Sequence, residues 1–412
     1  MSGEDWGSAQ YVRERFRRYY AINSGSVKAP PDILRREFGF LSFEGRSMYR
    51  HIAFRDVTEL RQYLRDYAPS HAYFSAAYYE KPDYEMENKG WQGADLVFDI
   101  DADHFDLACQ EEHDRWSCST CGREGRGHPP EACPGCGKAT FQEENWLCPD
   151  CLHAAKYEAQ KLLDILVQDF GFSPTGEISV NFSGNRGYHV HVRSKMVKAM
   201  DQLARREIVD YILGIGLKVE HQGFTSRPSG GNSNLAERGW RGRSTKALYD
   251  FISEASPEAI KDLKLSRPST KNLLESRAEI LDLLAKSHPS SIMKYLDQKS
   301  LGRMMDAAVG EQASAIDTVV TTDLRRLIRL PLTLHGKTGW LTQKVPIEEL
   351  ADYDPLLSAI AFTEGTERVY IRRAPEITIA GERYGPFEEE AAELPTAVAM
   401  FLLCRKAARV ER

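Results

Sequence analysis

Alternation of apolar and polar positions predicts a β-strand over residues 95–101. Successive side chains of a strand point to opposite faces, so the apolar residues share one face and the aspartates share the other. Asp99 and Asp101 therefore lie two positions apart on the same face. The apolar face is expected to pack against a core and to hold the two carboxylates in place.

A second pair of strands is predicted at residues 177–182 and 188–192. Between them, residues 183–187 read Ser-Gly-Asn-Arg-Gly. A short polar segment that contains glycines and joins two alternating segments is typical of a tight turn. The pattern predicts a β-hairpin with a glycine-rich tip.

Helical spacing of apolar residues predicts a helix from about Leu152 to Phe170, and Gly171 provides a stop signal. Residues 198–290 are also expected to be mostly helical. The segment from Thr225 to Thr245 is rich in glycine, serine and arginine, and we interpret it as a mobile basic loop.

Strand-like patterns return at residues 315–321, and residues from about Glu390 onward are expected to be helical. Strands and helices in this order predict an α+β fold, with mixed sheets flanked by helices and two insertions. The expected boundaries are an α+β core at residues 1–103, 152–197 and 300–389, a zinc-binding insertion at 104–151, a mostly helical insertion at 198–299 and a C-terminal helix at 390–412.

The composition is that of an ordinary globular protein, with 42% hydrophobic and 28% charged residues. The formal net charge is −6, so any site for nucleic acid must depend on local basic patches. Met1–Gln10 lacks the layout of a signal peptide, and the longest apolar run, Ala397–Cys404, is too short to span a membrane. We expect a cytoplasmic protein with no membrane segment.

Cysteines are concentrated in the insertion, where seven of the eight lie between Cys109 and Cys151. Six of these seven form three Cys-x-x-Cys pairs. In a large chain without a secretory signal, this spacing indicates zinc ligation and not disulfides. Cys404 lies alone in an apolar segment and is expected to be a buried small hydrophobic residue.

The ligands can be paired in two ways. The first pairing gives two structural zinc sites, a four-cysteine ribbon formed by Cys118, Cys121, Cys133 and Cys136, and a second site formed by Cys109, His113, Cys148 and Cys151. The alternative joins Cys118 and Cys121 to Cys148 and Cys151 and leaves the remaining cysteine pair with other ligands. His128 and His153 are weaker candidates. A zinc ion with four protein ligands has no open position and would not catalyse a reaction.

The segment Asp99-Ile100-Asp101 is a candidate site for a divalent cation. Two carboxylates on one face of a strand place their oxygens close together, which suits a hard ion such as Mg²⁺. Their mutual repulsion also favours a cation between them. Asp103 continues the alternation as a spare ligand or a surface charge. The simpler interpretation is a solvated acidic strand edge.

The turn at residues 183–187 and the start of the following strand form a candidate phosphate site. Glycines near Arg186 let the backbone approach an anion, and the guanidinium can donate two parallel hydrogen bonds to phosphate oxygens. His189 is placed on the side of these polar groups, where a protonated or hydrogen-bond-donating imidazole suits a triphosphate. The simpler interpretation is an ordinary hairpin with a surface arginine.

A basic segment lies further along the chain, with five lysines or arginines and one acid, Asp323, between residues 322 and 344. In an acidic protein, such a local excess of positive charge indicates a site for a polyanion. Arg329, His335 and Lys337 are candidate contacts for a triphosphate. Asp317, just before this segment, is a candidate third carboxylate, and a solvated basic loop is the simpler interpretation.

Together these segments resemble the small catalytic subunit of the archaeal and eukaryotic DNA primases, in the archaeo-eukaryotic primase superfamily. The matching segments are residues 36–38 with 49–50, 91–101, 146–156, 183–189 and 316–339. Two departures stand out: Asn185 takes the place where eukaryotic members often have a second arginine, and residues 114–145 resemble a zinc ribbon inserted into the family's zinc knuckle.

The resemblance implies roles for individual residues. The ligands of the catalytic Mg²⁺ or Mn²⁺ would be Asp99, Asp101 and Asp317. The nucleotide-binding residues would be Ser183, Arg186, His189, Arg329, His335 and Arg50, with Glu37 near them.

The resemblance also implies a reaction, which is template-directed synthesis of short primers from nucleoside triphosphates by two-metal nucleotidyl transfer, with release of pyrophosphate. The implied partners are a large regulatory subunit in a heterodimer and a single-stranded DNA template that contacts the basic segments. The implied location is the archaeal cytoplasm, at the replication fork. Two alternatives remain: a primase-polymerase of repair or plasmid replication, and a non-enzymatic zinc-ribbon scaffold that binds nucleic acid. The scaffold would explain the cysteines but not the aspartates.

Overall fold

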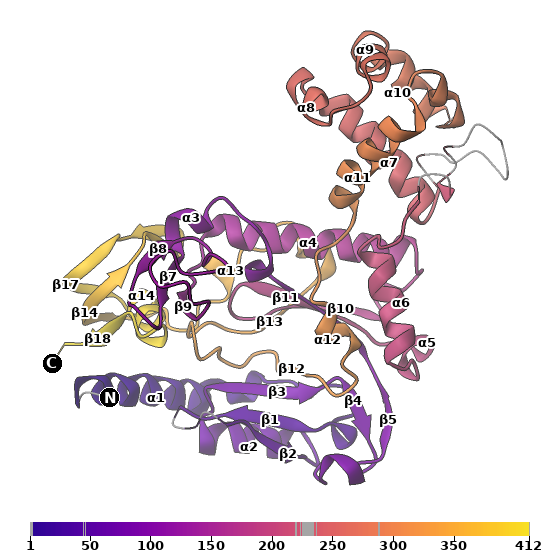
Figure 1. Ribbon diagram of the computed structural model, residues 1–412. Coiled ribbons are helices and arrows are strands. Elements are labelled where there is room, and N and C mark those ends of the chain that lie inside the picture. Colours follow the sequence, from indigo (N-terminus) through magenta and orange to yellow (C-terminus); the bar gives the residue numbers. More distant parts are fainter. Residues whose placement is uncertain are drawn as a thin grey trace. The chain divides into compact units, whose positions relative to one another are not determined.

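The structure, a computed structural model shown in Figure 1, describes residues 3–43, 45, 47–218, 221, 222, 224, 235, 237–286 and 289–411. The chain divides into two compact units. The first comprises Met1–Tyr157, Pro174–Leu203 and Asp317–Arg412, and the second comprises Glu158–Ser173 and Ala204–Ile316. The first unit combines sheets with helices and the second is built from helices, so the α+β class predicted from the sequence is confirmed.

Four antiparallel strands form the central sheet of the first unit, in the order β13-β10-β11-β6. Their bounds are Gln343–Val345 for β13, Ile178–Phe182 for β10, Gly187–Val192 for β11 and Leu96–Asp101 for β6. The predicted strand at 95–101 and the predicted hairpin are thus confirmed. The register places His189 opposite Asp99 and Gly187 opposite Asp101. Strand pairing therefore brings the glycine-rich turn beside the two aspartates.

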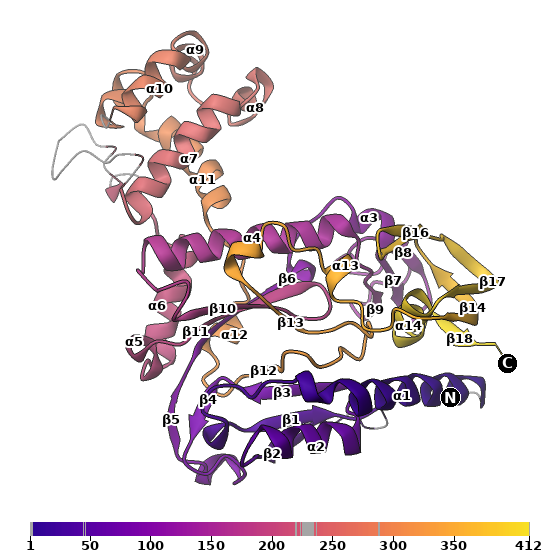
Figure 2. The same ribbon diagram turned by 180° about the vertical axis from the view of Figure 1, so that it is seen from behind.

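A second antiparallel sheet has the order β12-β3-β1-β2. Its strands are Leu327–Arg329 (β12), His71–Ser75 (β3), Phe38–Leu41 (β1) and Tyr49–Ile52 (β2). Both ribbon views show this sheet in one layer and the central sheet in another (Figures 1 and 2). In the register between β12 and β3, Arg329 lies opposite Tyr73.

Helices and small strand pairs surround the two sheets. These helices include α1 (Gly3–Asn23), α2 (Val57–Tyr67), α5 (Lys195–Lys198), α12 (Thr318–Thr322) and α13 (Pro355–Ser358). The strand pairs are β4 (Ala77–Tyr79) with β5 (Trp91–Ala94) and β15 (Ile377–Ile379) with β16 (Glu382–Tyr384). The first part of α4 (Pro149–Gln168) lies along the central sheet in both views (Figures 1 and 2). The helix predicted from about Leu152 to Phe170 corresponds to α4.

The cysteine-rich insertion contains its own three-stranded sheet, in the order β8-β7-β9. These strands are Glu124–Arg126, Arg115–Cys118 and Phe141–Glu144, and the short helix α3 (Gln110–His113) precedes them. Tight turns at Gly122 and Gly137, both with positive φ, follow the first two of the three Cys-x-x-Cys pairs, Cys118/Cys121 and Cys133/Cys136. The two glycines therefore allow the backbone to fold back around each pair.

The C-terminal segment forms a sheet as well as a helix. The order is β17-β14-β18, with β17 at Phe387–Pro395, β14 at Thr366–Ala374 and β18 at Ala408–Val410. The helix expected from about Glu390 to the end is confined to α14, Thr396–Cys404. The expectation was wrong for the flanking residues because β17 pairs with β14 along its length, and such pairing outweighs a local preference for helix.

The second unit has a hydrophobic core of its own. Its helices are α6 (Gln202–Ile212, which begins in the first unit), α7 (Trp240–Glu254), α8 (Pro257–Asp262), α9 (Arg267–Glu275), α10 (Arg277–Ala285) and α11 (Gln298–Gln312). Buried aliphatic residues from α7 to α11 form the core, among them Leu248, Leu273, Ile280 and Met304. No helix among the described residues is long and apolar enough to cross a membrane.

Two local predictions are wrong where tertiary contacts or caps decide the structure. The basic loop expected over 225–245 lies largely outside the described residues, but its last part begins α7, where Arg243 forms salt bridges with Asp164 and Asp169. Most of the segment 315–321, expected as a strand, lies in α12 (Thr318–Thr322), because the Asp317 side chain accepts hydrogen bonds from the first amides of that helix. A side-chain cap of this kind outweighs the strand preference of valine and threonine.

Candidate active site and zinc centres

A polar cavity of about 290 Å³ lies in the first unit and is lined by residues of both sheets. Asp99 and Asp101 come from β6, His189 from β11, and Tyr73 and Arg329 from the second sheet. The remaining lining residues are Asp103, Ser183, Asn185, Arg186, Arg326, Leu327, Ile328, His335 and Lys337. The cavity therefore has acidic groups and basic groups facing the same space.

The acidic side of the cavity carries the carboxylates of Asp99, Asp101 and Asp103. Burial, and then the negative charges of Asp101 and Asp317, raise the pKa of Asp99 to about 6. Oδ1 of Asp99 lies 3.4 Å from Nε2 of His189. Burial lowers the pKa of His189 to about 3, so this imidazole is neutral at pH 7 and can donate one hydrogen bond. Repulsion among the acids would be relieved by a bound cation.

Asp317 is close to this strand although it lies far from it in the sequence. Its amide donates to the carbonyl of Asp99 at 2.9 Å, while its carboxylate caps α12 through the amides of Val319 and Val320. Among the described residues, Asp99, Asp101 and Asp317 do not form a group whose ligand atoms all lie within 4.8 Å of one another. The backbone thus brings the third acid beside β6, although Asp317 is not among the residues that line the cavity and its Oδ1 caps the helix.

The glycine-rich turn is held against β6. Oγ of Ser183 accepts hydrogen bonds from the amides of Asn185 and Gly187, each at 3.3 Å. A Cβ atom at Gly187 would lie 1.8 Å from the carbonyl oxygen of Ile100, so only glycine fits there. Gly184 has a φ of +82°, and its carbonyl accepts a hydrogen bond from Thr338 at 2.6 Å.

Arg186 projects from this turn toward the acids. It forms a salt bridge with Asp103, and its Nε lies 3.7 Å from Oδ1 of Asp101. Burial lowers the pKa of Arg186, although the charge of Asp101 acts in the opposite direction. Asp103 is therefore the partner of Arg186 in this structure, and an anion bound by Arg186 would compete with it.

The basic side of the cavity is organised around Arg329. One guanidinium nitrogen contacts Nδ1 of His71, another lies 2.8 Å from Nε2 of His335, and the group lies 4.6 Å from the centre of the Tyr73 ring. Burial lowers the pKa of His335 well below 6.5 and that of His71 to about 2, so both rings are neutral. No described carboxylate forms a salt bridge with Arg329.

His71 and Tyr73, which contact Arg329, were not predicted from the sequence as residues of the site. They alternate with buried residues of β3, which is a sign of a strand with one polar face, but no motif distinguishes them. Arg50 and Glu37 lie elsewhere: Nε of Arg50 donates to Oε1 of Glu37 at 3.0 Å, and neither residue lines the cavity. Glu37 is fully buried and also lies 3.4 Å from Nζ of Lys89.

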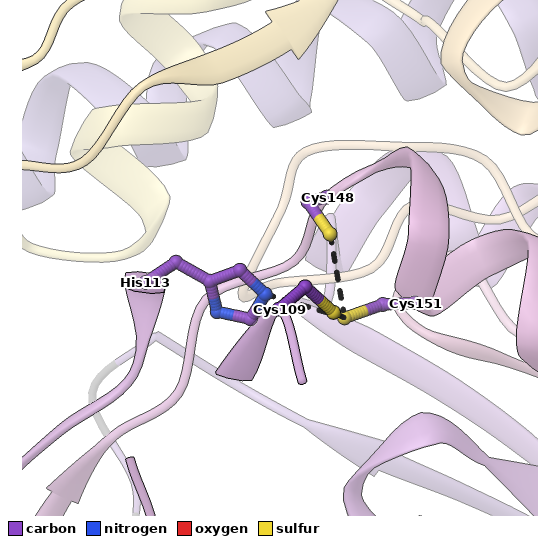
Figure 3. A group of neighbouring side chains, drawn as sticks. All are labelled: Cys109, His113, Cys148 and Cys151. Atoms are coloured by element: carbon purple, nitrogen blue, oxygen red, sulfur yellow. Dashed lines mark hydrogen bonds between the residues drawn. The ribbon is translucent and has the colours of Figure 1, made fainter. Parts of the chain in front are cut away.

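Two groups of cysteine and histidine side chains could each hold a metal ion. The ligand atoms of each group lie within 4.8 Å of one another, and the groups are Cys109, His113, Cys148 and Cys151, and Cys118, Cys121, Cys133 and Cys136. Figure 3 shows the first group, which we call the zinc knuckle, with its four side chains pointing toward one another. The structure thus groups the ligands as in the first of the two pairings that the sequence left open.

The geometry of both groups fits zinc. The Sγ–Sγ distances are 3.6 and 3.7 Å in the knuckle and 3.5 and 3.6 Å in the four-cysteine ribbon. Tetrahedral Zn–S bonds of about 2.3 Å would give about 3.8 Å between sulfur atoms. Nδ1 of His113 lies 2.7 Å from Oδ1 of Asp114, which orients Nε2 toward the thiols. His128 contacts Gln110 instead, at 3.1 Å.

Metal analysis of the purified chain is expected to give two zinc ions per molecule, because each group supplies four ligands to a tetrahedral ion. Replacing the exposed Cys136 by serine should reduce the content to one zinc. Cys404→Ser is the matched control, because Cys404 belongs to neither group, and it should retain two. A reproducible content of one zinc in the unmodified chain would reject the two-site assignment.

Comparison with known proteins gives concordant matches. The family model described as DNA primase small subunit matches residues 131–348. The chain is 36% identical to a protein of Methanothrix thermoacetophila named DNA primase small subunit PriS, over 98% of this chain and 99% of the relative. Proteins with the same name from Methanoregula boonei and Cenarchaeum symbiosum are 32% and 30% identical, over 98% and 96% of this chain and 99% and 96% of the relatives.

Proposed function

Because the chain belongs to the DNA primase small subunit family, we propose that it is the catalytic subunit of a DNA primase. In this proposal it joins nucleoside triphosphates on a single-stranded DNA template and releases pyrophosphate. The observation that carries the proposal is the unpaired charge of Arg329, held by neutral groups in a cavity whose opposite side bears Asp99 and Asp101. A partly buried cation without an anionic partner is costly unless a ligand supplies the anion.

The basic residues of the cavity would bind the triphosphate. Arg186 and Arg329 can each donate two hydrogen bonds to phosphate oxygens, and Lys337 adds a point charge. His189 is neutral, so it would donate a single hydrogen bond without adding charge. His335 is also neutral, and by accepting from Arg329 it would orient that guanidinium toward the phosphates. Ser183 would orient the turn that presents Arg186, through its contacts with two backbone amides.

The acidic residues would hold Mg²⁺ or Mn²⁺, because carboxylate oxygens suit hard divalent cations. Asp99 and Asp101 would be the principal ligands, and Asp317 a third. When bound, such ions activate the attacking 3′-hydroxyl and neutralise the triphosphate and the departing pyrophosphate. Asp103 would hold Arg186 in place until the phosphates displace it.

The proposal includes the partners of the reaction. A single-stranded DNA template would contact the basic residues around 322–344 through its phosphates. A large regulatory subunit would complete the enzyme in the cytoplasm, at the replication fork. These assignments rest on the family and on the local charge.

The direct test is primer synthesis by the zinc-replete chain on single-stranded DNA, with nucleoside triphosphates and Mg²⁺ or Mn²⁺. Short products that depend on the template, and pyrophosphate in proportion to them, are expected. A chain that binds DNA without releasing pyrophosphate would instead be a nucleic-acid-binding scaffold. Omitting the divalent cation while the two zinc ions stay bound provides the control.

A further inference from the structure

Arg405, directly after α14, is a charged residue to which the proposed function gives no role. Its Nη1 donates to the carbonyl of Asn145 at 2.7 Å, and the guanidinium lies 5.1 Å from the centre of the Trp146 ring and 4.9 Å from that of Phe401. Its Nε is buried without a hydrogen-bond partner among the described residues. No described carboxylate forms a salt bridge with it, so the groups in direct contact with this cation are a carbonyl and two aromatic rings. The negative charges of Asp114 and Glu144 favour the cation from a greater distance.

On one side, Arg405 is anchored to the zinc-binding segment. Oδ1 of Asp114 accepts a hydrogen bond from the amide of Trp146 at 2.7 Å, and the same oxygen lies 2.7 Å from Nδ1 of the zinc-knuckle residue His113. The carboxylate of Asp114 therefore positions both His113, a zinc ligand, and Trp146, whose ring lies against Arg405. Both ribbon views place α14 beside β7 and β9 of this segment (Figures 1 and 2).

On the other side, α14 packs against the loop that carries His335 and Lys337. The rings of Trp340 and Phe401 stack with their centres 5.2 Å apart. A Cβ atom at Gly339 would lie 3.5 Å from Sγ of Cys404 and 3.8 Å from Cβ of Met400, so loop and helix are already in close contact. The position of the loop that carries two cavity residues therefore depends on the end of α14.

Electrostatic coupling agrees with this placement. Burial, and then the positive charge of Arg186, lower the pKa of Arg405 to about 9. Burial and the charges of Arg186, Arg329 and Arg405 lower the pKa of Lys337. The basic groups thus repel one another, and an anion in the cavity would relieve that repulsion.

We propose that Arg405 is a positioning residue for the triphosphate: anchored on the zinc-binding segment, it holds the loop of His335 and Lys337 and adds a fixed positive charge behind the phosphate-binding residues. This inference rests on the proposed function. The charge is in place before the ligand binds, so it lowers the energy of a bound polyanion without further rearrangement. Its effect should grow with the number of phosphates on the ligand, because a remote charge acts on the total charge of that ligand.

The test measures equilibrium dissociation constants of ATP and ADP by calorimetry, without template, for zinc-replete wild type and variants. Arg405→Met is expected to weaken ATP binding by about tenfold and ADP binding by clearly less, whereas Arg405→Lys should restore most of the affinity for ATP. Arg409→Met is the matched control and should leave both constants unchanged. Arg409 is another C-terminal arginine stacked on an aromatic ring, 4.6 Å from the centre of Tyr370, and it does not line the cavity.

Arg405→Gln provides a second route if the methionine variant does not fold, because glutamine keeps a hydrogen-bond donor but carries no charge. Equal losses of affinity for ATP and for ADP would show that Arg405 acts through packing and not through its charge, and would overturn the inference. Unchanged affinity in a charge-removing variant that keeps both zinc ions would also overturn it. A wild-type chain that binds neither nucleotide would instead overturn the proposed function together with this inference.

Discussion

Replacing Asp101 by alanine is expected to reduce template-directed primer synthesis by about a thousandfold, which corresponds to about 4 kcal/mol of transition-state free energy. Asp101 ends β6 at the cavity and is one of the two carboxylates that alternate on its polar face. Its removal would weaken the site of the divalent cation and leave the charge of the triphosphate less well neutralised. The measurement is the initial rate of pyrophosphate release on single-stranded DNA.

The matched control for this prediction is Asp106→Ala. Asp106 follows a few residues later, is exposed and does not line the cavity, so its removal should leave the rate unchanged. Zinc content and thermal unfolding should be the same in both variants and the wild type. Full activity of a folded, zinc-replete Asp101→Ala protein would argue against a cation site on β6 and favour a scaffold.

Replacing Arg329 by methionine is expected to lower kcat/KM for nucleoside triphosphates by roughly 30- to 150-fold. The change removes charge-assisted hydrogen bonds to phosphate, which together contribute about 2 to 3 kcal/mol. Methionine keeps much of the side-chain volume above Tyr73 but leaves His71 and His335 without their shared donor. A parallel thermal unfolding experiment therefore separates a loss of stability from a loss of affinity.

Arg383→Met is the control for Arg329, because Arg383 is an exposed arginine of β16 paired with Glu376. It removes the same charge from the protein without changing the cavity, so both kinetic constants should match those of the wild type. If Arg329→Met raised neither the KM nor the dissociation constant of ATP, the unpaired cation would not be a phosphate-binding group.

Local sequence patterns were sufficient to predict the strands that carry most of the residues of the proposed active site. Period-two alternation around Asp99 identified β6, and two alternating segments around a glycine-rich turn identified the β10–β11 hairpin. The reason is that these strands bury a continuous apolar face, so their own sequences record their periodicity. The cysteine spacing was also informative because each pair is a local feature: two pairs lie at tight turns, and Cys148 and Cys151 lie at the start of α4.

The features that the sequence did not predict correctly depend on contacts outside the local pattern. Residues 318–322 look like a strand by composition, but the carboxylate of Asp317 satisfies the first amides and favours a helical turn. Residues 387–395 pair with β14 along their whole length, which no local pattern around Glu390 revealed. His71 and Tyr73 acquire a role only because β3 pairs with β12.

The sequence by itself determined which side chains share a strand face, which glycines permit a tight turn and which cysteines can form pairs, because each property depends on neighbours only a few residues away. Tertiary structure alone decided that Asp317 lies beside Asp99, that the knuckle joins Cys109 to Cys151, and that Arg405 donates to the carbonyl of Asn145. Those contacts join residues that are far apart in the chain. Their free energy depends on strand pairing and on packing around the complete core, and neither is encoded in the spacing of any single segment.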